Sequence, residues 1–135
     1  MVFNKSHLAS APVPALEDAR KAALAFDVAA RKLCLRGGSL ILVGSYFRPS
    51  VGIGATVNQD RLKFLIGFLT LLLEPWVLFW DFNFPPEALQ ASGWLDKGGG
   101  VIVSPADIAY TCRAGVQQVY DYIILSKSAL GGLRV

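Results

Sequence analysis

The longest apolar stretch of the sequence is residues 64–80, FLIGFLTLLLEPWVLFW, and it contains Glu74 and Pro75 just past its middle. A membrane-spanning helix needs about 20 consecutive apolar residues, and a carboxylate inside a bilayer is strongly unfavourable. Proline also interrupts a helix, because its ring removes a backbone donor. The stretch therefore predicts a helix that ends before Pro75, followed by a buried strand, WVLFW.

Two further apolar runs have the length of a strand. SLILVGSYF, residues 39–47, lies between Gly-Gly and Arg-Pro, and VYDYIILS, residues 119–126, carries a single charge. Strands that alternate with helices predict an α/β (α+β layered) fold around a sheet that is buried on at least one face. The other expected elements are a loop over residues 48–58, a helix from Asn58 or Asp60 to Pro75, a helical turn from Pro85 or Pro86 to Gly93, and a short strand over residues 101–103.

Length and composition are those of a single globular domain or a part of one. The chain has 135 residues, of which 53% are hydrophobic and 17% charged, so it is not a disordered chain. Six basic and three acidic side chains fall in residues 1–36, which therefore hold the whole formal charge of +3, a weak argument for a polyanionic partner. Two cysteines without a framework or metal-ligand spacing, and no secretory signal, predict an intracellular protein, cytoplasmic or nuclear.

The N-terminal segment is predicted to consist of two parts. Residues 1–14 are expected to be a flexible leader. Residues 15–36 are expected to form an amphipathic helix, because apolar side chains recur there at helical spacing. Glu17 lies in its first turn, Arg36 lies at its end, and a Gly-Gly pair follows.

Four polar residues occur at or inside the apolar strands. Tyr46 closes the first strand, Asp81 and Asn83 end the second, and Asp121 lies within the third. At one edge of a sheet, a carboxylate can deprotonate water, and an amide and a phenol can hold a phosphate or carbonyl oxygen. Asp and Asn are also common where strands simply turn, so the pattern alone leaves an active site and a strand-end turn both open.

Three ordered motifs resemble the endonuclease/exonuclease/phosphatase family, which includes DNase I-like nucleases, abasic-site repair nucleases, retroelement endonucleases and phosphoinositide phosphatases. WVLFWDFNFPPEAL resembles the family's GDFN strand, and LILVGSYFRPSVG followed by NQDRLKFLIGFL resembles the strand, loop and helix before it. TCRAGVQQVYDYIILSKSAL resembles a later strand with a Ser-x-Ile-Asp-Tyr pattern. The resemblance implies a partial four-layered α/β sandwich of the DNase I-like type over residues 37–135.

The resemblance also implies roles for the four polar residues. Asp81 would activate the attacking water, Asn83 would orient Asp81 and contact the scissile phosphate, and Tyr46 would donate to a phosphate oxygen. Asp121 would orient a histidine. The implied cofactor is Mg²⁺, which neutralises charge that develops on the phosphate, and the implied partner is nucleic acid, above all DNA.

The sequence departs from the family pattern at functional positions. Trp80 stands where the family has a glycine before its aspartate, and the chain reaches Val135 before any Ser-Asp-His motif. His7, the one histidine, lies in the predicted leader, and Glu17 matches no metal-binding pattern. We therefore expect a truncated domain of retroelement-endonuclease type with weak or absent hydrolytic activity, because such groups act as a unit.

One alternative belongs to another class of function. The apolar segment 64–80 could serve a non-catalytic binding or membrane-associated module, although a membrane partner is not expected from its length. The sequence does not indicate which phosphate ester would be the substrate, which residues would bind a metal, or the oligomeric state.

Overall fold

The computed structural model describes residues 9–104, 111 and 118–132 of the chain. In this part of the chain, six strands form one mixed sheet in the order β1-β2-β3-β4-β6-β5. The elements are β1 Ala9–Ala11, α1 Pro14–Asp18, α2 Arg20–Ala25, β2 Val28–Leu35, β3 Gly38–Ser45, α3 Thr56–Leu69, β4 Trp76–Asp81, α4 Pro86–Ala91, α5 Trp94–Gly98, β5 Gly100–Val103, β6 Asp121–Ser126 and α6 Lys127–Gly132.

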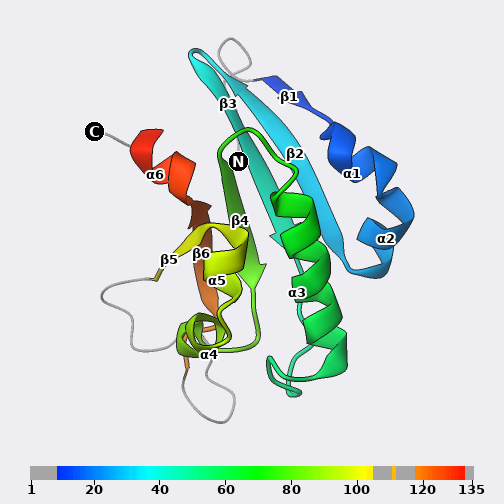
Figure 1. Cartoon of the computed structure of the whole chain (residues 1–135), viewed down its shortest axis with the longest axis vertical. Helices are drawn as coiled ribbons and strands as arrows, with labels where there is room; N and C mark the ends of the chain where they lie inside the picture. Colours follow the sequence, from blue (N-terminus) through cyan, green and yellow to red (C-terminus); the bar gives the residue numbers. More distant parts are fainter. Residues whose placement is uncertain (1–8, 105–110, 112–117, 133–135) are drawn as a thin grey trace.

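The sheet has its parallel pair at the centre. β3 and β4 run parallel and are joined through α3, whereas the other neighbouring strands pair antiparallel. Figure 1 shows α3 lying across one face of the sheet, with α4 and α5 on the same side. Alternate residues of β3, Ile41 and Val43, are fully buried, as is Leu65 of α3, so the core lies between this face and the helices. The predicted α+β architecture is confirmed.

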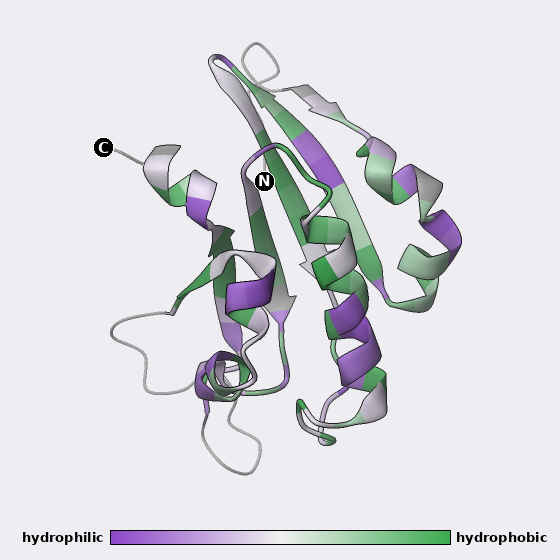
Figure 2. Cartoon of the chain, in the orientation of Figure 1, coloured by the Kyte–Doolittle hydropathy of each residue, from purple (hydrophilic) through white to green (hydrophobic). Residues whose placement is uncertain are grey.

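The hydropathy of the strands follows their place in the sheet. Figure 2 shows hydrophobic residues along β3 and β4 in the middle of the sheet and a hydrophilic band across β2. The three strands predicted from apolar runs are present, and the short strand expected near residue 101 is β5. The helix predicted to reach Pro75 ends earlier, at Leu69. The carbonyl of Pro75 already accepts a hydrogen bond from the N–H of Ile41 in β3, so the chain must leave the helix and turn into the sheet before Pro75.

The amphipathic helix predicted over residues 15–36 is wrong. The segment forms two short helices, α1 and α2, and then the eight-residue strand β2. Every residue of β2 pairs with a residue of β3, from Val28 opposite Ser45 to Leu35 opposite Gly38. This ladder of hydrogen bonds in a buried sheet outweighs the weak helical preference of the segment, and the glycines expected to end a helix instead belong to a hairpin.

The predicted leader is also wrong in its last residues, whereas residues 1–8 lie outside the described part. Residues 9–11 form β1, which pairs with β2, and the side chain of Val13 is 3% exposed. The N-terminal segment therefore contributes an edge strand and a core residue. Short, irregular segments of this kind have no periodicity from which a strand could be predicted.

Two short helices, α5 and α6, were not predicted. α5 lies between Gly93 and Gly99, which both have positive φ angles, and the indole N–H of Trp94 donates to the carbonyl of Leu62 in α3. Within the described residues, no helix is long and apolar enough to span a membrane. The apolar stretch 64–80 is divided between α3 and β4.

The packing around β5 predicts opposite effects for two glycine substitutions. A Cβ atom at Gly100 would lie 2.6 Å from Cγ2 of Ile124 and 3.1 Å from an indole carbon of Trp76, so Gly100→Ala is expected to destabilise the fold by about 1–3 kcal/mol. A Cβ atom added at Gly67, inside α3, would have no atom within 4 Å apart from its neighbours in the helix, so Gly67→Ala is expected to stabilise the fold by about 0.5–1 kcal/mol. Urea unfolding measures both; equal midpoints for the two variants would contradict the packing described here.

Candidate active site

Three of the four predicted site residues lie in one row across neighbouring strands. Asp81 at the end of β4 is opposite Asp121 at the start of β6. The parallel register pairs Gly44 of β3 with Phe79 of β4, so Tyr46 is level with Asp81, each two residues further on. Tyr46 and Asp121 are exposed and Asp81 is half-buried. A phenol and two carboxylates thus line one edge of the sheet.

Buried aromatic rings hold the end of β4 in place. In the sequence Asp-Phe-Asn-Phe, residues 81–84, the two phenylalanines are 1% and 2% exposed. The ring of Phe82 stacks on Tyr122 of β6 at 4.1 Å between centroids and on Phe47 at 5.6 Å. Phe84 meets Phe47 edge to face at 5.0 Å. Because side chains alternate between the two faces of a strand, burial of Phe82 places Asp81 on the face away from the core, and Asn83 follows in a turn beyond the strand.

The phenol of Tyr122 belongs to this buried cluster rather than to the row. Its hydroxyl donates to the carbonyl of Phe84 at 3.2 Å. Burial raises the pKa of the Tyr122 hydroxyl, with a smaller contribution from Glu87. The hydroxyl therefore stays protonated and serves as a fixed donor that ties β6 to the chain after β4.

The strand-end turn that the sequence left open is present. The backbone N–H of Asn83 donates to Oδ1 of Asp81 at 3.0 Å, an Asx turn, and Asn83 has a positive φ of 55°. The amide Nδ2 of Asn83 donates to the carbonyl of Phe47 at 2.9 Å. One of its two amide hydrogens is thus committed to the chain after β3.

Electrostatics single out Asp81. Burial raises the pKa of the Asp81 carboxyl, the negative charge of Asp121 raises it further, and the N–H of Asn83 partly opposes both. A carboxyl with a raised pKa is a better base than an ordinary one, as water activation requires.

At the start of β6, Oγ1 of Thr111 lies 3.0 Å from the backbone nitrogen of Asp121 and accepts its hydrogen.

The donor set fits Mg²⁺ in one respect. Mg²⁺ is often held by one or two carboxylates together with waters and phosphate oxygens of the substrate, and Asp81 and Asp121 provide such a pair. In the described residues, no group of three or more His, Cys, Asp or Glu side chains could hold a metal ion. His7 lies outside that part, and Glu17 is exposed on α1.

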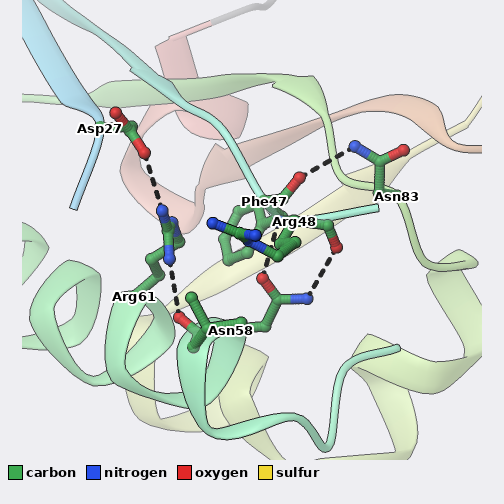
Figure 3. A network of polar contacts seen from close by, with 7 residues as sticks. Asp27, Phe47, Arg48, Asn58, Arg61 and Asn83 are labelled. Atoms are coloured by element: carbon green, nitrogen blue, oxygen red, sulfur yellow. Dashed lines mark hydrogen bonds and ion pairs between the residues drawn. The ribbon is translucent and has the colours of Figure 1, made fainter. Parts of the chain in front are cut away.

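A polar network that the sequence patterns did not predict surrounds the N-terminal half of α3. Asn58, in the first turn of α3, is completely buried. Its Oδ1 accepts from the N–H of Arg48 at 2.8 Å and its Nδ2 donates to the carbonyl of Arg48 at 3.1 Å (Figure 3). Its Nδ2 also donates to the carbonyl of Gly52 at 2.9 Å. Arg61, 7% exposed, donates from Nη2 to Oδ2 of Asp27 at 2.7 Å. Both lie on the inward face of α3 among leucines, and a polar residue in an apolar stripe signals a buried partner.

The chain has a DNase I-like fold. It is similar to the endonuclease domain of TRAS1, a telomere-specific non-LTR retrotransposon, with a TM-score of 0.61 at 18% identity over 96% of this chain and 60% of that one. It is also similar to a humanized D. rerio TDP2, with a TM-score of 0.59 at 17% identity over 95% and 56%.

A third similar structure is an endonuclease/exonuclease/phosphatase family protein from Leptotrichia buccalis, with a TM-score of 0.54 at 12% identity over 75% of this chain and 41% of that one. The chain therefore spans 60% or less of these three proteins. No family model matches the sequence, and no curated protein matches it. The partial DNase I-like fold predicted from the motifs is confirmed.

The carboxylate pair predicts a linked titration. Asp121→Asn removes a neighbouring negative charge and is expected to lower the pKa of Asp81, with the contribution from burial left in place. NMR titration of ¹³C-labelled carboxyl carbons measures this shift, and Asp96→Asn on the exposed side of α5 is the matched control. An Asp81 carboxyl that titrates identically in Asp121→Asn and wild type would contradict the coupling.

Asp81 is also expected to affect stability in a definite direction. Because its pKa is higher in the folded chain than in the unfolded chain, it stabilises the fold at pH values below the unfolded pKa, and this contribution is lost as pH rises through the folded pKa. Asp81→Asn should therefore raise the denaturation midpoint relative to wild type at neutral pH more than at acidic pH. Chemical denaturation at both pH values tests the sign.

Proposed function

We propose that this chain is part of a phosphoester hydrolase of endonuclease type, with the row Tyr46, Asp81 and Asp121 as its catalytic edge. The observation that carries this proposal is the register: three residues from distant parts of the sequence lie level on adjacent strands of a DNase I-like fold. A row of two carboxylates and a phenol suits the activation of water beside a phosphate.

The proposed mechanism assigns one task to each side chain. Asp81, with its raised pKa, accepts a proton from the attacking water. The amide of Asn83 donates its second hydrogen to a phosphate oxygen while the first stays on the carbonyl of Phe47. The phenol of Tyr46 donates to another phosphate oxygen. Asp121 sets the charge beside Asp81 and is the candidate partner of a catalytic histidine.

The proposed cofactor is Mg²⁺, with Asp81 and Asp121 as its candidate protein ligands. When bound, it would neutralise negative charge that develops on the phosphate. The negative charges of Asp81 and Asp121 would attract such a cation. Metal dependence is therefore part of the proposal and of its test.

The proposed substrate is nucleic acid, and low activity is expected. The TRAS1 endonuclease domain and TDP2 match 96% and 95% of this chain, so the likeness extends over the N-terminal strands as well as the row. The chain spans 60% of that endonuclease domain, and a hydrolase site works as a unit. We therefore expect cleavage well below that of a complete domain.

Nicking of supercoiled plasmid DNA by the purified chain tests this proposal. We expect slow nicking that requires Mg²⁺ and stops with EDTA. Asp81→Asn should slow it by about 10²–10⁴-fold, because it removes the proton acceptor. Asp96→Asn, which also removes one carboxylate but lies on α5, should nick at the wild-type rate.

Circular dichroism on every sample establishes that each variant is folded. Nicking that survives in Asp81→Asn would exclude Asp81 as the base and point to a contaminating nuclease. A folded wild-type chain that cleaves neither supercoiled plasmid nor an abasic-site duplex in Mg²⁺ would overturn the proposal for the chain by itself.

A further inference from the structure

The segment directly after β3 has no regular structure, yet each of its residues is held by a different part of the fold. The N–H of Tyr46 donates to the carbonyl of Asp27 at 3.3 Å, and the carbonyl of Phe47 accepts from Asn83 at 2.9 Å. Arg48 is held through both its N–H and its carbonyl by the side chain of Asn58 (Figure 3). Three consecutive residues are thus fixed by the residue before β2, by the turn after β4 and by α3.

Unusual backbone conformations gather around this same segment. In the described residues, the non-glycine residues with positive φ are Asp27, Ser50 and Asn83, at 52°, 63° and 55°. Asp27 and Asn83 are two of the groups that hold the segment, and Ser50 lies within the turn that Asn58 closes from Arg48 to Gly52. Such conformations are unfavourable by themselves and persist where surrounding contacts over-determine them, most often at functional sites.

Packing of the Tyr46 and Arg48 side chains does not explain why the backbone of this segment is held so firmly, because both side chains are exposed to solvent. Phe47 is buried, whereas Tyr46 is 42% exposed and Arg48 is also exposed. A rigid backbone beneath an exposed phenol has a clear use if the phenol must meet a ligand in a fixed geometry. The side chain of Asn58 is 0% exposed and makes three hydrogen bonds, all of them to backbone atoms of Arg48 and Gly52 in the loop after β3.

We propose that Asn58 is a positioning residue, which acts through the backbone of residues 46–48 to hold the Tyr46 phenol level with Asp81 and Asp121. This inference rests on the proposed function for its purpose, but the ordering of Tyr46 by Asn58 can be measured without catalysis. Asn58 does not touch the substrate; it fixes the chain on which the phosphate-binding phenol stands. The Arg61–Asp27 ion pair supports the same chain from the other side, because the carbonyl of Asp27 accepts from the N–H of Tyr46.

The fold offers a matched control on the same helix. Gln59, the next residue of α3, also bonds to the loop, from Nε2 to the carbonyl of Ile53 at 2.7 Å. This bond lies beyond the turn that Asn58 closes, far along the loop from Tyr46. A general loss of loop stability would follow from either residue, whereas loss of Tyr46 positioning should follow from Asn58 alone.

Asn58→Asp is the variant of choice. It keeps the oxygen that accepts from the N–H of Arg48 and loses both donated bonds. The new carboxylate would be buried against the carbonyl oxygens of Arg48 and Gly52, which is unfavourable, so circular dichroism must first establish that this variant is folded. Asn58→Ala, which removes all three bonds, serves as a second variant if Asn58→Asp unfolds.

The first measurement is the χ1 rotamer of Tyr46, from three-bond NMR couplings in the full chain with ¹³C-labelled tyrosine. The chain has four tyrosines, and Tyr46→Phe assigns the signal. We expect one rotamer in wild type and Gln59→Ala, and averaged couplings in folded Asn58→Asp. Couplings unchanged in Asn58→Asp would overturn the proposal.

The second measurement is a double-mutant cycle on Mg²⁺-dependent nicking. Asn58→Asp is expected to slow nicking by about 10- to 100-fold, and Gln59→Ala by less than about twofold. Tyr46→Phe combined with Asn58→Asp should be no slower than Tyr46→Phe alone, because both remove the same contact. A double variant slowed by the product of the single effects would contradict the role of Asn58. If no chain nicks DNA, the proposed function fails, and the rotamer measurement still decides this inference.

Discussion

The stacked rings of Phe82 and Tyr122 are the contact on which the candidate site depends. They join the end of β4 to β6 across the sheet, and Phe47 brings the end of β3 into the same cluster. Because Phe82 directly follows Asp81, burial of its ring directs the Asp81 side chain to the other face of the sheet, and burial of Phe84 fixes the far side of the turn at Asn83. The free energy gained in the core thus also fixes the geometry of the row.

Much of the central architecture could be predicted from the sequence. The strands β3, β4 and β6 are continuous apolar runs with polar ends, the signature of buried strands, and the parallel pair with its connecting helix follows from their order. The N-terminal segment could not be predicted in this way. The apolar stripe of helical spacing that begins at Leu16 continues through Ala30 and Leu33, and pairing with β3 makes residues 28–35 a strand.

The sequence was sufficient to predict which residues form the candidate site, but not which hydrogen bonds they make. Tyr46, Asp81 and Asp121 stood out as polar residues in apolar runs, and the register brings them level. That Asn83 uses its amide on the carbonyl of Phe47 depends on a contact 36 residues away in sequence, which no local pattern encodes. Asn58 was visible only as a polar residue on the apolar stripe of α3, and its partners are backbone atoms, which every residue type carries.

The order of the strands has a consequence for how the chain folds. β1, β2 and β3 pair with their neighbours in sequence, so these pairings close short loops and can form early. Asp81 and Asp121, in contrast, face one another across a separation of 40 residues, and β5 reaches the sheet only through β6. The row of Tyr46, Asp81 and Asp121 therefore assembles with the least local pairing of the described sheet, and a partly folded chain that already has its N-terminal strands would still lack the row.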